Sequence, residues 1–260
     1  MGPVWWASAY CLFLLASSGD IASGLSTGDV VTIAGGKANT LYAEGAGSEA
    51  AFNEPSGIAC SSDGKTLYVG DTLNHRIRQV QLITPLPAGA GGGLASTVAG
   101  SGQAGSADGQ GESAEFNEPS GVAVALGGSV LYVADQGNNV IREVDLASRE
   151  VAVLAGSGDP GLWDSTAPLQ AMFRRPRGLA ASADGSTLVV ADTGNHCVRL
   201  VEIASGRVTT VAGTGQAGFA NGQGESAQFN EPWGVAVGAG TSTIFVADTL
   251  NRRVRKLTFK

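Results

Sequence analysis

The chain has 260 residues, with 23 acidic and 16 basic side chains that give a formal net charge of −7. Nonspecific nucleic-acid binding needs clustered Lys and Arg to neutralise phosphates, so this acidic balance makes nucleic acid an unlikely partner. Glycine is abundant, at 39 residues, and follows no three-residue period, which excludes a collagen-like chain. The composition instead suits short strands joined by tight turns.

The N-terminal stretch carries no charge up to Gly19, and an apolar run from Val4 to Ala16 is followed by small residues. This pattern is typical of a secretory signal peptide, expected here over residues 1–24, with residues 25–260 as the mature domain. The run is too short to cross a bilayer, so no membrane span is expected after signal removal. The expected location is secreted or lumenal. The alternative is an intracellular fragment of a larger protein.

One stretch of sequence occurs four times, starting at Phe52, Phe116, Phe173 and Phe229. Its second copy reads FNEPSGVAVALGGSVLYVADQGNNVIR. The copies start 64, 57 and 56 residues apart, and the longer first interval contains the Pro- and Gly-rich insertion TPLPAGAGGG from Thr84. Internal repetition at a steady period predicts a repeat architecture.

Each repeat contains β-rich runs bounded by turn residues, and no window has a sustained helical apolar period. In the second repeat the runs cover residues 122–125, 130–134, 140–146 and 151–155. Consecutive four-stranded meanders are typical of a β-propeller, in which neighbouring sheets bury each other's faces. The expected fold class is all-β, a four-bladed propeller of four-stranded antiparallel sheets.

The two ends of the chain suggest how the ring closes. The last repeat stops after its third run, and an unassigned run, Val30 to Ala34, has the pattern of a fourth strand and is followed by Gly35-Gly36. We predict that Val30 to Ala34 completes the last blade and leaves no open edge, which favours a monomer. The competing interpretation is a larger ring, completed by further sequence or by a second copy.

Three polar positions recur in every repeat: an Asp after the second run, an Asn three residues later and an Arg four residues after the Asn. Asp and Asn bond nearby backbone amides, so their spacing predicts a tight turn. A guanidinium between packed sheets needs an acceptor, for which the repeat Asp is the candidate. Because four catalytic centres in one chain would be unusual, we interpret the set as structural. Its members are Asp71, Asn74, Arg78, Asp135, Asn138, Arg142, Asp192, Asn195, Arg199, Asp248, Asn251 and Arg255.

The turn motif carries a family resemblance. The segments NHRI from Asn74 and NHCV from Asn195, with the strands before them, resemble the NHL repeat, and the resemblance covers about Asp29 to Lys260. The second and fourth repeats lack the His, reading NNV and NRR. The resemblance implies a β-propeller used mostly as a platform for proteins, RNA or small ligands. A minority of such propellers are enzymes, such as the peptidyl-amidating lyases.

The enzyme interpretation is limited by the available ligands. The resemblance implies several His around a metal in an amidating lyase, and a catalytic zinc site usually has three protein ligands. This chain has only His75 and His196, at equivalent positions of two repeats. We therefore predict no catalytic residue, metal site or cofactor. The alternative is a propeller enzyme, metal-dependent and lactonase-like or lyase-like, acting on a small molecule at the channel mouth.

Candidate binding residues lie where the repeats depart from their own pattern. The residue after the repeat Pro is Ser in the first two copies but Arg and Trp in the last two, and Arg and Trp are frequent binding anchors. This position starts the innermost strand, so its copies should ring one mouth of the channel. The alternative to a protein or small-ligand surface is drift on exposed loops. The candidates are Trp233, Arg177, Arg174, Arg175 and Trp163.

Overall fold

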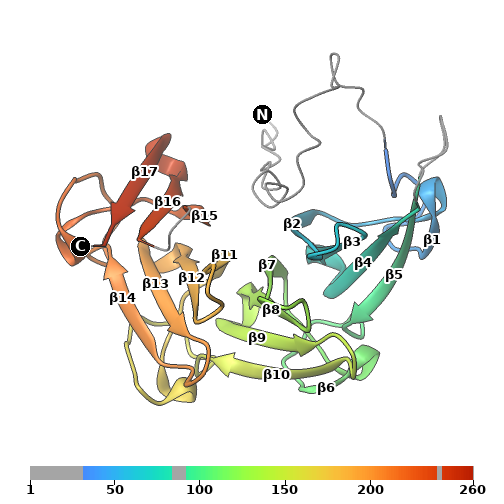
Figure 1. The fold of residues 1–260 in the computed structure, drawn as a ribbon, viewed down its shortest axis with the longest axis horizontal. Helices are drawn as coiled ribbons and strands as arrows, with labels where there is room; N and C mark the ends of the chain where they lie inside the picture. The colour runs from blue at the N-terminus through green and yellow to red at the C-terminus, as the bar shows by residue number, and fades with distance from the viewer. Residues whose placement is uncertain (1–31, 84–91, 239–241, 260) are drawn as a thin grey trace.

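The computed structural model describes residues 32–83, 92–238 and 242–259. These residues form four antiparallel sheets that stand side by side around a common axis (Figure 1). In each sheet the first strand of the repeat lies nearest the axis and the later strands follow outward (Figure 1). This is a four-bladed β-propeller arrangement, and the predicted fold class is confirmed.

The strands follow the repeats in order. Blade one contains β2 (Pro55–Cys60), β3 (Thr66–Asp71), β4 (Arg76–Leu82), β5 (Gly93–Ala99) and the short β1 (Gly45–Ala46). Blade two contains β7 (Pro119–Val124), β8 (Val130–Asp135), β9 (Val140–Asp145), β10 (Glu150–Ala155) and the short β6 (Gly109–Gln110). Blade three contains β11 (Pro176–Ala181), β12 (Thr187–Asp192), β13 (Cys197–Glu202) and β14 (Val208–Ala212). Blade four contains β15 (Pro232–Val237), β16 (Thr243–Asp248) and β17 (Arg253–Thr258).

The helical elements of the described residues are single 3₁₀ turns. Four follow the repeat Asp and join the second strand to the third: η2 (Thr72–Asn74), η4 (Gln136–Asn138), η6 (Thr193–Asn195) and η8 (Thr249–Asn251). The other four lie in the segments that lead into a blade: η1 (Gly47–Glu49), η3 (Gly111–Ser113), η5 (Pro168–Gln170) and η7 (Gly224–Ser226). The tight turn expected from the Asp–Asn spacing is therefore a 3₁₀ turn.

The innermost strands begin at the repeat Pro, earlier than the apolar pattern indicates. In blade one, Pro55 pairs with Asp71, and regular pairing resumes at Ile58 with Val69 after a shift in register. The extra residue in β2 is a β-bulge, and such a position accommodates a proline, which lacks a backbone N–H. The same shift follows Pro119 in blade two.

The inner strands of neighbouring blades approach closely at the Gly of the Pro-x-Gly motif. A Cβ on Gly121 would lie 2.0 Å from the carbonyl oxygen of Arg177 in the next blade, so only glycine fits there. Farther out, Phe116 is fully buried in a cluster that contains Ile77 from blade one and Leu131 from blade two. Backbone contact near the axis and apolar side chains farther out hold the blades together.

The predicted closing strand, Val30 to Ala34, lies only partly among the described residues. Val30 and Val31 lie outside the described residues, as does the expected signal segment 1–24. Ile33 lies against blade one, where its carbonyl oxygen accepts a hydrogen bond from Gly93 N at 3.1 Å and its side chain packs on the cluster of Val80 and Ala95. The described part of the last sheet has the order β15-β16-β17, and the first and last sheets lie at the two ends of an arc (Figure 1). Ile33 and Ala34 thus make apolar contacts with blade one, as Val98 and Ala99 of blade one do with Phe116 of blade two.

Candidate functional site

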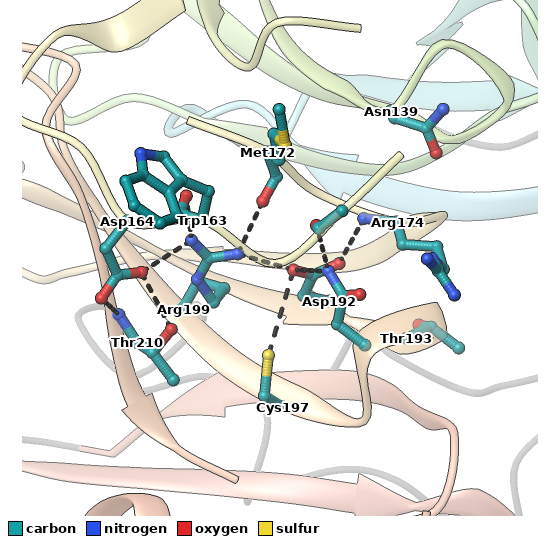
Figure 2. A network of polar contacts seen from close by, with 12 residues as sticks. Asn139, Trp163, Asp164, Met172, Arg174, Asp192, Thr193, Cys197, Arg199 and Thr210 are labelled. Carbon is teal, nitrogen blue, oxygen red and sulfur yellow. Dashed lines mark hydrogen bonds and ion pairs between the residues drawn. The ribbon is translucent and has the colours of Figure 1, made fainter. Parts of the chain in front are cut away.

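Each blade holds an arginine on its third strand, and blade three shows its surroundings (Figure 2). Nη1 of Arg199 donates to Oδ2 of Asp192 at 2.8 Å and to the carbonyl oxygen of Met172 at 2.9 Å. Its Nη2 donates to the carbonyl oxygen of Trp163 at 2.9 Å and to Oδ1 of Asp164 at 2.7 Å. We call this arrangement the arginine hub. It ties the third strand to the segment that leads into the blade.

The hub recurs in all four blades. The distances from the arginine Nη1 to the aspartate Oδ2 are 2.9 Å (Arg78–Asp71), 3.2 Å (Arg142–Asp135), 2.8 Å (Arg199–Asp192) and 2.8 Å (Arg255–Asp248). The first three arginine side chains are fully buried, and that of Arg255 is 11% exposed. A buried charge is tolerated only when it is paired, so the hub residues depend on one another.

The aspartate of the hub has both carboxylate oxygens engaged. In blade three, Asn195 Nδ2 donates to Oδ2 of Asp192 at 2.8 Å, and the backbone N–H of Arg174 donates to Oδ1 at 2.8 Å. Burial raises the pKa of Asp192 to about 6, while Arg199, Asn195 and the Arg174 amide act in the opposite direction. These contacts favour a scaffold role for the Asp, Asn and Arg positions.

In blades one to three, the residue after the 3₁₀ turn that follows the repeat Asp reaches the next blade. Its side chain accepts a hydrogen bond from the backbone N–H of the residue before the next repeat Pro. The acceptor and donor pairs are His75 with Glu118 (3.1 Å), Asn139 with Arg175 (3.0 Å) and His196 with Glu231 (3.1 Å). The histidine of the turn motif therefore links neighbouring blades, and an asparagine makes the same link in blade two.

Arg177 and Trp233 meet at the innermost strands of blades three and four. The Arg177 guanidinium carbon lies 4.1 Å from the centre of the Trp233 ring, a cation–π contact. Burial, and then the charge of Arg175, lower the pKa of Arg177, while Glu231 and Glu118 oppose the lowering. Within the described residues, Arg177 Nε and Trp233 Nε1 are buried without a hydrogen-bond partner. The pair thus places a cation against an aromatic ring, without a hydrogen-bonded carboxylate among the described residues.

The other three candidate binding residues, Arg174, Arg175 and Trp163, do not lie together. Arg175 is exposed, and its guanidinium lies 4.0 Å from the carboxylate of Glu118. Arg174 is also exposed, and Figure 2 shows it at the opposite end of the Arg199–Asp192 network from Trp163. Trp163 is 62% exposed and lines a separate groove on blade three. The structure therefore groups Arg175 with Arg177 and Trp233, and it places Trp163 elsewhere.

Sequence reasoning missed the acidic residues that face these candidates. Glu118 and Glu231 act on Arg177, but both belong to the shared Asn-Glu-Pro pattern and look identical to Glu54. The available signal is that the third repeat alone has Arg before and after its Pro. An arginine in one blade beside a glutamate in the next would have suggested a charged cluster.

Among residues 32–83, 92–238 and 242–259, no group of three or more His, Cys, Asp or Glu side chains is placed to hold a metal ion. In the same ranges, no helix has both the length and the apolar character needed to span a membrane.

The sheets, their order around an axis and the recurring hub define a repeat-built β-propeller. Residues 173–199 match the family model of the NHL repeat. Together with the relatives described next, this match confirms the resemblance to the NHL repeat family.

Two relatives are similar to the chain, and one of them is named for its NHL repeats. The chain is 26% identical over 283 residues to Protein SUPPRESSOR OF QUENCHING 1, chloroplastic, of Arabidopsis thaliana, covering 82% of the chain and 26% of the relative. It is 30% identical over 171 residues to NHL repeat-containing protein 2 of Homo sapiens, covering 63% of the chain and 23% of the relative. The chain thus spans about a quarter of the length of these relatives.

Solved structures share the fold at low identity. A Bacteroides thetaiotaomicron protein of unknown function aligns with a TM-score of 0.62 at 20% identity, covering 79% of this chain and 47% of the other. An auxiliary nutrient binding protein from the same organism aligns with a TM-score of 0.60 at 20% identity, covering 80% of this chain and 48% of the other. At these identities the likeness establishes the fold alone.

Proposed function

We propose that the chain is a noncatalytic NHL-repeat β-propeller that serves as an interaction platform for a protein or a small ligand. The observation that carries the proposal is the Arg177–Trp233 pair, in which an arginine and a tryptophan replace the Ser of the first two repeats. Both side chains lie on innermost strands, and Arg177, unlike the hub arginines, has no hydrogen-bonded carboxylate among the described residues. A ligand with acceptor groups and an apolar part would satisfy this combination.

Two further observations support this role. The residues shared by the repeats are engaged in the arginine hubs or in links between blades, whereas Arg177 and Trp233 are not. A protein with the same fold is described as nutrient binding, which agrees with ligand binding by such a scaffold. The proposed site consists of Arg177 and Trp233 with Arg175 at its edge.

The proposal includes a setting for the protein. It acts as a monomer in a secreted or lumenal location, after removal of a signal peptide over residues 1–24. The acidic net charge of −7 supports a partner other than nucleic acid.

The test replaces Arg177 and Trp233 with Ser, the residue at this position in the first two repeats. Three proteins are immobilised: the natural protein, the double variant Arg177→Ser with Trp233→Ser, and the control Ser56→Ala. Each is exposed to an extract of the producing organism, and the retained proteins and small molecules are quantified by mass spectrometry. The natural protein and the Ser56→Ala control should retain the same species, and the double variant should lose them. If everything retained by the natural protein is also retained by the double variant, the proposal is overturned.

A further inference from the structure

Blades one and four each hold one of their own arginines against an aromatic ring. Arg76, the first residue of β4, has its guanidinium carbon 4.1 Å from the centre of the Tyr42 ring, and its Nη2 donates to the carbonyl oxygen of Ser101 at 2.6 Å. Arg253, the first residue of β17, lies 4.0 Å from the centre of the Phe219 ring. The guanidinium fills the space between the third strand and the segment that leads into the blade.

The hub identifies the same place in blade three. In every one of these blades, Nη2 of the hub arginine donates to a backbone carbonyl oxygen of the segment that leads into the blade. Tyr42 and Phe219 directly precede the accepting residue in blades one and four. In blade three the accepting residue is Trp163, so the counterpart of Tyr42 is Leu162. The first residue of β13 is Cys197, a buried side chain too short to fill the space that Arg76 fills. Blade three therefore has no arginine of its own at this position.

A groove of about 320 Å³ lies at this place. Gly213 and Thr214 in its lining correspond to Gly100 and Ser101 of blade one, because both pairs directly follow a fourth strand. Whereas the Ser101 carbonyl oxygen accepts from Arg76, that of Thr214 accepts no hydrogen bond from the described residues. The lining residues are Leu162, Trp163, Asp164, Thr210, Gly213, Thr214 and Glu225.

The chemistry of the groove suits a cation. Trp163 presents an indole that is 62% exposed, and within the described residues the exposed Glu225 carboxylate has no hydrogen bond or ion pair. Asp164, by contrast, is held by Arg199 and by Thr210 (Figure 2). An aromatic face, a carbonyl oxygen and a carboxylate are the groups that bind a guanidinium.

We propose that this groove of blade three binds a guanidinium group, supplied by an arginine side chain of a partner protein, in the place that Arg76 occupies in blade one. The partner arginine lies beside Leu162, the counterpart of Tyr42, and stacks on the adjacent Trp163. It donates to the Thr214 carbonyl oxygen and pairs with Glu225. Two blades of the same chain already bind a guanidinium beside this segment, which favours arginine over lysine. The groove is separate from the Arg177–Trp233 site and does not depend on it.

The test uses three short peptides, acetyl-Gly-Arg-Gly-amide and its lysine and citrulline counterparts, followed through the Trp163 indole N–H resonance in NMR titrations. The arginine peptide should shift this resonance saturably, and the citrulline peptide, which has the same shape without the charge, should not. The lysine peptide should bind more weakly. Equal shifts with arginine and citrulline, or equal affinities for arginine and lysine, would overturn the proposal.

Three variants locate the site. Glu225→Gln should weaken binding of the arginine peptide roughly two- to fivefold, as expected for an exposed ion pair. Glu112→Gln is the matched control, since Glu112 occupies the same place in the Gly-Glu-Ser turn of blade two and should leave binding unchanged. Trp163→Ala, followed by isothermal calorimetry, should weaken binding on the order of tenfold. Identical behaviour of the two Gln variants would contradict the assignment.

Discussion

Two arginines of blade three show how the same side chain serves different ends. Arg199 is fully buried and donates to two carboxylates and two backbone carbonyls of its own blade. Arg177 is half-buried and stacks on Trp233 of the next blade, and its guanidinium makes no hydrogen bond to the described residues. An arginine is part of the scaffold where the fold supplies its acceptors, and a candidate for binding where it does not.

The largest effect should come from breaking a hub. Arg199→Ala leaves Asp192 buried without its cation and removes the donors to Met172 and Trp163. Removing one partner of a buried ion pair costs about 3–5 kcal/mol, so the free energy of unfolding should fall by this amount. Denaturant unfolding followed by circular dichroism measures it.

Arg255→Ala provides the internal control for the hub. Its side chain is 11% exposed, so water can partly solvate the Asp248 left behind, and the loss should be smaller than for Arg199→Ala. An equal or larger loss for Arg255→Ala would contradict the role assigned to burial.

Close packing of the inner strands gives the next effect. Gly121→Ala places a methyl group 2.0 Å from the Arg177 carbonyl oxygen, a backbone atom that moves only with its strand. Overpacking of this kind costs about 1–3 kcal/mol, which should appear as a lower thermal midpoint. An unchanged midpoint would show that the blades are not in contact at this position.

Removing the hydrogen bond between the His196 side chain and the Glu231 backbone should have a smaller effect on stability. His196→Ala removes the acceptor for the Glu231 N–H, which lies 3.1 Å from Nδ1, and should cost about 1 kcal/mol. His196→Asn should restore most of it, because Asn139 makes the same link in blade two. Hydrogen exchange at the Glu231 amide measures the link directly, and equal protection in both variants would refute it.

The pH dependence should separate a buried carboxylate from an exposed one. Burial raises the pKa of Asp192 to about 6, whereas Ser182 and Ser186 lower that of the exposed Asp184 to about 2. Because the pKa of Asp192 is higher in the folded protein than its ordinary value of 3.8, protonation of this carboxyl stabilises the fold. This contribution is full below pH 3.8 and is lost as the pH rises through 6. Asp184 acts oppositely, losing its contribution as the pH falls through 2. Carboxyl NMR titrations should give these two midpoints, and a shared midpoint near 4 would contradict both environments.

Local patterns predicted the blades well because each blade is made by residues close in sequence. The β-rich runs gave the second and third strands, and the Asp–Asn spacing gave the turn between them. Contacts between blades were harder to predict. His75 accepts from Glu118, a pairing that depends on how two blades pack and not on either repeat alone.

The segment around Ile33 shows the same limit. Gly35 N donates to Gly47 O at 2.9 Å, just as Gly100 N donates to Gly111 O at 3.0 Å, so the segment enters blade one as the fourth strands enter the next blade. The local resemblance was sound at these residues, while the pairing of the strand before them depends on how the blades pack. Likewise, Trp163 could not be separated from Arg177 without knowing that the segment before blade three folds onto the hub of Arg199.

The distinction between scaffold and binding residues is tested most directly by one comparison of unfolding free energies. Arg199→Ala and the double variant Arg177→Ser with Trp233→Ser are unfolded by denaturant under the same conditions. The account predicts a loss of about 3–5 kcal/mol for the first variant and about 1–2 kcal/mol for the second, since Ser already occupies this position in two blades. A larger loss for the double variant than for Arg199→Ala would contradict the account.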